Sequence, residues 1–184
     1  MATAGTLKNS ALVVVDAQAG VMKGAFEATR IVNNISEAVS RARQNQVPVF
    51  WIQHSDEELV KDSEDWQLVS GLKAQENELI IEKNFNSAFE NTTLGSALSN
   101  MDIGHIVLAG AATNWCIRAT AYGALEWGYD LTLLGDAHTT KDMDPGEGVV
   151  VTAVDLIRDL NTTIKWLSYP GRTNDTMSFE AYRF

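Results

Sequence analysis

The sequence predicts an α/β protein whose parallel β-sheet is covered by helices on both faces. Short apolar runs rich in β-branched residues alternate with longer segments whose apolar residues recur at helical spacing. The runs are continuously apolar, as in residues 11–15, which is typical of strands buried on both faces. Alternating strands and helices of this kind favour parallel pairing, with the helices packed against the sheet.

Six runs carry the strand pattern. The first ends at Asp16, and the second tolerates Pro48 because proline is acceptable near the start of a strand. The fifth is followed by Gly135-Asp136. The predicted strands are residues 11–15, 47–52, 79–82, 105–109, 129–134 and 162–166.

Four segments predict helices from their apolar spacing. In the first, Ile31, Ile35 and Ala38 recur every three or four residues. We expect Thr93 to cap the second helix and Gly128 to end the third. The predicted helices are residues 29–45, 93–100, 114–128 and 148–160, with a polar excursion at 54–73 that contains a short helix and an aperiodic tail at 168–184.

Length and charge bound the class of protein. A chain of 184 residues suits one compact domain, so we expect a single domain over residues 1–184. The formal charge of −10 disfavours binding to nucleic acid or to an anionic membrane surface. One cysteine cannot form an internal disulfide, and no apolar run approaches the ~18 residues that span a bilayer. We expect a cytoplasmic protein that acts on a small-molecule substrate.

Three residues at the ends of predicted strands have complementary chemistry. Asp16 follows the first strand, Lys83 follows the third, and Cys116 lies in the turn after the fourth. Ligands of parallel sheets bind beyond the carboxyl ends of the strands, so one edge can bring the three together. A thiolate attacks carbonyl carbon, an ammonium beside it lowers the thiol pKa, and a carboxylate can carry a proton to a leaving amine.

Each of these residues also has a plain structural interpretation. Aspartate at a strand end often caps a turn, lysine after a strand is usually solvated, and a lone cysteine is often a small buried hydrophobe. For Cys116, the start of the following helix favours a thiolate, because unpaired N–H groups and the helix dipole stabilise negative charge. A redox role is a further alternative, although the chain has no second cysteine to resolve an oxidised one.

Four stretches together carry a family resemblance that is more specific than any one motif. They are residues 11–18 with Asp16 and Gln18, residues 82–89 with Lys83 followed by Thr93-Leu94, residues 110–116 with Cys116, and residues 119–137. In these stretches the chain resembles the isochorismatase-like cysteine hydrolases, a superfamily that includes nicotinamidases, N-carbamoylsarcosine amidases and streptothricin hydrolase. The resemblance runs from about residue 10 to residue 166.

The resemblance implies a three-layer αβα sandwich with a six-stranded parallel sheet. It assigns the role of proton shuttle to Asp16, of electrostatic partner to Lys83 and of nucleophile to Cys116. It also implies a non-proline cis peptide bond between Ala111 and Ala112, which would aim the Ala112 N–H alongside that of Cys116 at a developing oxyanion. The implied activity is hydrolysis of a small-molecule C–N amide bond through a thioester. Vinyl-ether hydrolysis of the isochorismatase type and non-catalytic metabolite binding remain as alternatives.

Substrate-contacting candidates flank these three residues. They are Gln18, His54, Phe85 and Trp115, with His138 a candidate for the pocket rim. Nicotinamidases bind a metal through an Asp-x-His pair and a further histidine, whereas here His54 is followed by Asp56. We therefore predict no catalytic metal, no cofactor and no nicotinamidase activity. His54 either hydrogen-bonds substrate or caps its strand.

The aromatic residues predict a homo-oligomer. The chain has five tryptophans, and its tail adds Tyr169, Phe179, Tyr182 and Phe184. Large exposed apolar patches usually mark interfaces, and members of the resembled family commonly form dimers or tetramers. We therefore expect at least a dimer in which residues 168–184 contribute to the contact or lie over a neighbouring active site.

Overall fold

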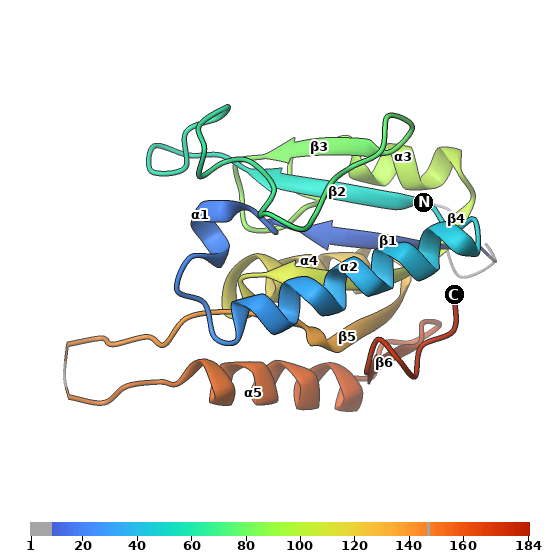
Figure 1. Ribbon diagram of the computed structural model, residues 1–184. Coiled ribbons are helices and arrows are strands. Elements are labelled where there is room, and N and C mark those ends of the chain that lie inside the picture. Colours follow the sequence, from blue (N-terminus) through green and yellow to red (C-terminus); the bar gives the residue numbers. More distant parts are fainter. Residues whose placement is uncertain (1–8, 147) are drawn as a thin grey trace.

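The computed structural model describes residues 9–146 and 148–184, and it confirms the predicted αβα fold. Six parallel strands form one sheet in the order β3-β2-β1-β4-β5-β6, between two layers of helices (Figure 1). The strands are β1 (Asn9–Val15), β2 (Val49–His54), β3 (Leu79–Lys83), β4 (Ile103–Ala111), β5 (Asp130–Thr139) and β6 (Asn174–Met177). The helices are α1 (Ala19–Met22), α2 (Ala28–Gln44), α3 (Leu94–Asn100), α4 (Arg118–Trp127) and α5 (Ala153–Trp166), and a π-helical turn, η2 (Thr113–Ile117), precedes α4. Within the described ranges, no helix is both long and apolar enough to cross a bilayer.

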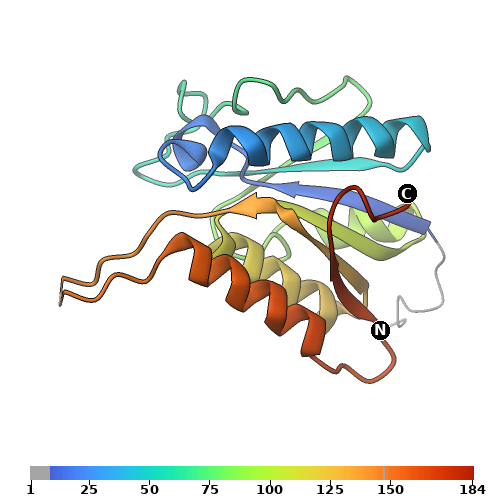
Figure 2. The same ribbon diagram turned by 60° about the horizontal axis from the view of Figure 1, so that its bottom comes forward.

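The sheet buries side chains on both of its faces. Leu12 and Val14 of β1 pack in the cluster that contains α2, whereas Val13 and Val15 pack with α3, α4 and α5. Figure 2 shows α2 on one side of the sheet and α4 and α5 on the other. All four side chains are fully buried. Burial of an aliphatic side chain contributes on the order of 1.5–3 kcal/mol. The strands are therefore continuously apolar because helices cover both faces of the sheet.

The predicted sixth strand is wrong. Residues 162–166 form the last turn of α5, in which Leu160 and Ile164 are buried four residues apart in the same core cluster. The β-branched run in this segment suggested a strand, but burial of one helical face outweighs that local preference. The sixth strand is β6, a polar segment of the tail that pairs with β5 at the edge of the sheet.

Helix ends follow the predictions in part. α4 ends at Gly128 with φ 97°, as predicted. At α3, the hydroxyl that accepts the Leu94 N–H, at 3.2 Å, belongs to Thr92 and not to the predicted Thr93. α5 begins later than predicted, where the Thr152 hydroxyl accepts the Asp155 N–H. After His54, which ends β2, residues 55–73 form turns, bends and one isolated β-bridge at Leu68 in place of the short helix predicted there.

The tail is anchored on its own chain. The Phe179 N–H donates to the Asp136 carboxylate at 2.9 Å. Arg41 of α2 donates to the carbonyl oxygens of Phe179 and Tyr182, at 2.5 and 3.1 Å. The Tyr182 side chain is buried in the α2 cluster. These contacts order the tail without a neighbouring subunit, and the homo-oligomer stays a prediction.

His138 of β5 lies in the interior and not at a pocket rim. Its Nδ1 lies 2.8 Å from the Thr113 hydroxyl and its Nε2 lies 2.9 Å from Asn161 Oδ1. The Asn161 amide nitrogen donates to the Gly135 carbonyl at 2.9 Å, so Oδ1 is the acceptor and the His138 hydrogen sits on Nε2. Complete burial lowers the pKa of His138 to about 4.

We expect His138 to make the fold sensitive to acid. The unfolded imidazole has a pKa of about 6.5, so between that value and about 4 the unfolded chain binds a proton that the folded chain does not. Its contribution to stability is complete above pH 6.5 and is lost as the pH falls toward 4, by about 3 kcal/mol in all. Urea unfolding at pH 7 and pH 4 should show this extra loss in the wild type relative to His138→Gln. Parallel losses in the two proteins would contradict it.

Candidate active site

Asp16, Lys83 and Cys116 meet at the carboxyl edge of the sheet, where the sequence predicted them. Asp16 follows β1, Lys83 ends β3, and Cys116 lies in η2 just after β4. Strand order reverses at β1, because β2 pairs on one side of it and β4 on the other. Crevices at such reversal points are the usual ligand sites of open α/β sheets.

The Lys83 ammonium connects the acid to the thiol. Its Nζ lies 2.7 Å from Asp16 Oδ2 and donates to Cys116 Sγ at 3.2 Å. It also donates to the Phe85 carbonyl at 3.1 Å and contacts His54 Nδ1 at 3.2 Å. Asp16 is 1% exposed, Lys83 is 2% exposed and Cys116 is 8% exposed. The three groups therefore interact with little screening by water.

The segment that carries Cys116, residues 110–116, starts from a close main-chain contact. Gly110 has φ 125°, and a Cβ at this position would lie 1.9 Å from the carbonyl oxygen of Val15. Only glycine fits, because both the backbone conformation and the space exclude a side chain. The peptide bond between the following two residues, Ala111 and Ala112, is cis, as the family resemblance implied. The chain therefore leaves the end of β4 in direct contact with the end of β1.

Cys116 sits in a π-helical turn instead of the α-helix predicted from residue 114 onward. The Ala112 carbonyl accepts hydrogen bonds from the N–H groups of Trp115 and Ile117, both at 3.1 Å. The regular α-helix begins only at Arg118. Such wide turns are rare and occur frequently at functional sites.

The resting site holds a thiol beside a carboxylate. Burial and the nearby Asp16 carboxylate together raise the pKa of the Cys116 thiol to about 12. This overturns the expectation of a low thiol pKa at a helix start. Burial also raises the pKa of Asp16, against the opposing charge of Lys83. A proton that moves from Cys116 to Asp16 leaves the net charge of the buried site unchanged, and the raised pKa makes Asp16 a better proton acceptor than a solvated aspartate.

One oxygen of Asp16 is available to receive a proton. Oδ2 faces Lys83, whereas Oδ1 is buried and has no hydrogen-bond partner among the described residues. Buried polar atoms are rarely left unpaired, and the exceptions often have a catalytic role. A carboxylate oxygen in this state can accept a proton from a neighbouring group.

Gln18 uses its side-chain amide to join three segments. The amide nitrogen donates to the carbonyl oxygens of His54, at 2.9 Å, and Trp66, at 2.8 Å. The amide oxygen accepts the His54 N–H at 2.8 Å. Gln18 is fully buried, so these bonds tie the end of β2 and the 54–73 excursion to the end of β1. The sequence proposed it as a substrate contact, but its hydrogen-bonding groups face the main chain.

His54 belongs to the same cluster as the three chemically active residues. Its Nε2 lies 3.0 Å from Asp56 Oδ2, and its Nδ1 faces Lys83. The other Asp56 oxygen accepts the N–H groups of Glu58 and Leu59, and these bonds hold the pKa of Asp56 below its usual value. Among the described residues, no three His, Cys, Asp or Glu side chains are grouped to hold one metal ion. Metal-independent catalysis stays a prediction.

A cavity of about 290 Å³ opens beside residues 110–116, the segment that carries Cys116. Its lining residues are Val21, Ala112, Trp115, Thr140, Lys141, Asp142 and Met143. Trp115 is 52% exposed in its wall, whereas Phe85, also exposed, lies outside it. Asn114 binds the far wall, because its Oδ1 accepts the Thr140 hydroxyl at 2.6 Å and its Nδ2 contacts the Met143 sulfur at 2.9 Å.

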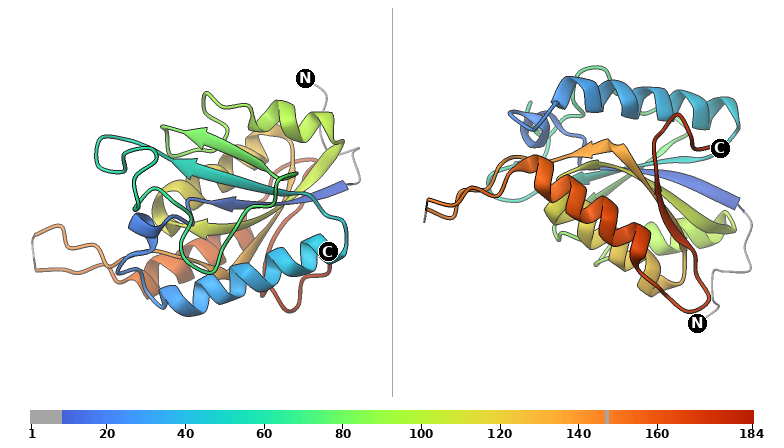
Figure 3. Two further views of the ribbon diagram at one scale, coloured as in Figure 1. Left: turned by 45° about the horizontal axis from the view of Figure 1, so that its top comes forward. Right: turned by 90° about the horizontal axis from the view of Figure 1, so that it is seen from below.

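Thr140 to Met143 were missed as site residues. β5 runs to Thr139, whereas the sequence predicted its end at residue 134. Had the strand been extended, the same strand-end rule would have selected them. The segment after β5 projects beyond the carboxyl edge of the sheet before it returns to α5 (Figure 3).

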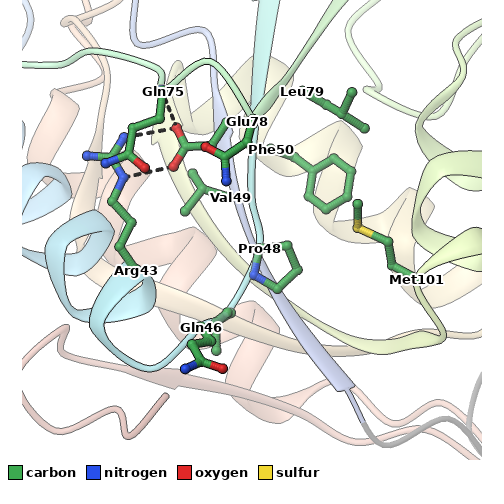
Figure 4. Close-up of a pocket in the computed structure, with 11 residues that line it drawn as sticks. Arg43, Gln46, Pro48, Val49, Phe50, Gln75, Glu78, Leu79 and Met101 are labelled. Atoms are coloured by element: carbon green, nitrogen blue, oxygen red, sulfur yellow. Dashed lines mark hydrogen bonds and ion pairs between the residues drawn. The ribbon is translucent and has the colours of Figure 1, made fainter.

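A further cavity, of about 380 Å³, lies at the opposite end of the sheet, near the starts of β2 and β3 (Figure 4). Its polar wall is an ion pair between Arg43 and Glu78, with N–O distances of 2.8 and 2.9 Å. Glu78 also accepts from Trp51 Nε1 and the Gln75 N–H. Its carboxylate is therefore engaged in holding structure, and this cavity carries no comparable catalytic set.

The chain thus folds as an αβα sandwich in which an acid, an ammonium and a thiol meet at the strand ends. Residues 10–162 match the family model described as the isochorismatase domain. The match spans most of the chain, which therefore belongs to the isochorismatase family of hydrolases.

The chain is also similar in sequence to two named hydrolases and in fold to a solved structure. The chain is 29% identical to a streptothricin hydrolase of Streptomyces noursei, over 76% of this chain and 58% of that protein. It is 30% identical to the ureidoacrylate amidohydrolase RutB of Klebsiella pneumoniae, over 61% of this chain and 66% of that protein. The chain thus spans less than two thirds of the length of either relative. The crystal structure of a cysteine hydrolase from Pseudomonas syringae pv. phaseolicola superposes with a TM-score of 0.85 at 24% identity, covering 94% of this chain and 89% of that one.

Replacing Asp16 with asparagine should separate thiol reactivity from proton transfer. The substitution removes the carboxylate that helps to raise the thiol pKa and leaves Lys83 without its counter-ion, so the thiolate becomes that counter-ion. Iodoacetamide should then alkylate Cys116 at least about tenfold faster than in the wild type at pH 7.5. The rate can be followed by intact-mass spectrometry, with Cys116→Ala as the blank. Slower alkylation in Asp16→Asn would show that Asp16 already generates the thiolate in the free protein.

Proposed function

We propose that this protein is a cysteine hydrolase that cleaves a C–N amide bond of a small molecule through a thioester on Cys116. The observation that carries the proposal is the placement of one buried ammonium, Lys83, in contact with both Asp16 and Cys116. A metabolite-binding protein has no need of this arrangement. A nucleophilic hydrolase needs all three groups. The thiol supplies the nucleophile, the carboxylate accepts its proton, and the ammonium stabilises the thiolate that results.

The first step forms the carbon–sulfur bond. The Cys116 proton moves to Asp16 Oδ1 as Sγ attacks the amide carbonyl carbon, and the Lys83 ammonium stabilises the negative charge that develops on the sulfur. The carbonyl π-electrons move to oxygen, and the N–H groups of Ala112 and Cys116 are the donors that we assign to this oxyanion. The Ala112 assignment is supported by its position in the cavity wall.

The second step breaks the carbon–nitrogen bond. Protonated Asp16 gives its proton to the leaving nitrogen, the oxyanion electrons reform the carbonyl, and an amine or ammonia departs from the thioester. Water then attacks the thioester carbon while Asp16 takes its proton. Collapse of this second intermediate releases the acid, and the proton returns to the sulfur, which restores the resting site.

The relatives support hydrolysis of this kind. One is named for streptothricin hydrolysis and another for amidohydrolysis of ureidoacrylate. Vinyl-ether hydrolysis and metabolite binding are the competing functions, and neither gives a thioester on Cys116. Detection of that adduct therefore separates amide hydrolysis from both.

Replacing Cys116 with alanine should abolish hydrolysis and leave the fold intact. We expect a loss of at least about 10³-fold in kcat, as when other enzymes lose their nucleophile. The measurement is a screen of small amides that reads released ammonia or amine, with Cys116→Ala as the matched blank and thermal unfolding as the test of folding. Acid quenching during turnover should trap the acyl group on Cys116, as seen by peptide mass spectrometry. Equal turnover in the two proteins would contradict the proposal.

The cavity offers one cationic contact, Lys141, for a small amide that carries an acidic group, while the Asp142 carboxylate in the same lining accepts the Ala153 N–H. Val21, Trp115 and Met143 supply apolar surface. Lys141 lines the same cavity and forms no ion pair with any residue in the ranges 9–146 and 148–184. An ammonium in this position can bind a substrate carboxylate through a charge-assisted hydrogen bond.

Replacing Lys141 with methionine should therefore change specificity and not chemistry. Hydrogen bonds to charged groups contribute about 1.5–3 kcal/mol, so KM for a carboxylate-bearing amide should rise by roughly 10- to 100-fold. KM for the matched neutral amide should stay within about threefold, and Lys141→Arg should behave like the wild type. An equal rise in KM for both amides would contradict the role of Lys141.

A further inference from the structure

Lys83 has more acceptors than hydrogens. An ammonium carries three N–H donors, and four acceptors surround Nζ within 3.2 Å. The Asp16 carboxylate, at 2.7 Å, and the Phe85 carbonyl, at 3.1 Å, are the nearest two. The third N–H faces both His54 Nδ1 and Cys116 Sγ, each at 3.2 Å. These two atoms compete for one hydrogen.

Asp56 determines which nitrogen of His54 faces this competition. Asp56 is held as an anion by two main-chain N–H groups, and its Oδ2 lies 3.0 Å from His54 Nε2. An anionic acceptor at that distance favours the tautomer with hydrogen on Nε2. Nδ1 then presents its lone pair to Lys83. A neutral imidazole nitrogen is a better acceptor than a thiol sulfur, whereas a thiolate is better than either.

We propose that His54, oriented by Asp56, holds the third N–H of Lys83 while Cys116 is a thiol, and so keeps the nucleophile protonated until a substrate is bound. When the thiol proton leaves for Asp16, this N–H turns from His54 to the sulfur. His54 is thus a positioning residue that acts through Lys83. The inference rests on the proposed function only in assigning the nucleophile to Cys116.

The placement of His54 is built into the sheet. His54 and Lys83 are register partners on the adjacent strands β2 and β3, so their side chains share a face. Gln18 holds both the N–H and the carbonyl of His54. The imidazole is therefore held at the ammonium by main-chain geometry as well as by Asp56.

The charged groups around the thiol are few. Asp16 and Lys83 flank it, and Asp56 acts on it only through His54. Glu82, the neighbour of Lys83, pairs with Lys61 at 2.7 Å on the exposed side of the strand. The neutral Asn86 contacts Sγ at 3.9 Å. A change at His54 therefore reaches the thiol through Lys83.

The test measures Cys116 alkylation by iodoacetamide in the full chain without substrate, between pH 6 and pH 10. His54→Leu removes the competing acceptor and should speed alkylation at pH 7.5 by at least about tenfold, with the thiolate absorbance near 240 nm appearing at lower pH. His54→Asn keeps an acceptor near the Nδ1 position and should stay within about threefold of the wild type. Asp56→Asn should lie between the two. Alkylation in His54→Leu that is equal to or slower than in the wild type would overturn the proposal.

Two controls separate this result from unfolding and from the wider function. In the double variant His54→Leu/Lys83→Met, the faster alkylation of Cys116 should vanish. A thiol exposed by unfolding would instead stay reactive. Faster alkylation that persists in the double variant overturns the proposal. Asp56 is half exposed, so Asp56→Asn tests the same competition with little change to the core. The readout needs no substrate. Failure to hydrolyse any amide would refute the proposed function alone, and unchanged alkylation in an active hydrolase would refute the role of His54 alone.

Discussion

The site depends on the buried ion pair between Lys83 and Asp16. Two charges that leave water lose several kcal/mol of hydration each, so such a pair persists only where each partner neutralises the other and the remaining donors are satisfied. Here the Phe85 carbonyl and His54 complete the surroundings of the ammonium. β1 and β3 are separated by β2, and strands lie about 4.8 Å apart. A long, flexible side chain is required to span that gap, which explains why lysine occupies the end of β3.

Much of this arrangement follows from the sequence. Continuous apolar runs located β1 to β5, and the rule that ligands bind at the carboxyl ends of parallel strands selected Asp16, Lys83 and Cys116. β6 was missed because an edge strand needs no apolar run, and Thr162 to Trp166 misled because β-branched residues also occur in a helix that is held by tertiary packing.

What the sequence could not supply is information about neighbours across the sheet. The contact between His54 and Lys83 depends on the register of β2 against β3, and no local pattern encodes it. The thiol pKa was predicted in the wrong direction for the same reason. A helix start near Cys116 is a local feature, whereas its burial and the proximity of Asp16 arise only when distant strands meet. The cavity residues after β5 were not predicted because the end of this strand was placed at residue 134, five residues before its actual end at Thr139.

The contact of Gly110 with Val15 has a consequence for how the family can diverge. The separation of Asp16 and Cys116 is set by main-chain atoms of β1 and β4, which touch with no room for a side chain. Substitutions in the surrounding core alter side-chain packing and therefore lower stability before they disturb this spacing. Four residues in the walls of the cavity, Trp115, Lys141, Asp142 and Met143, are exposed and lie beyond the strand ends, so they are under no such constraint. Selection can thus remodel what the protein recognises while the reacting atoms keep their positions.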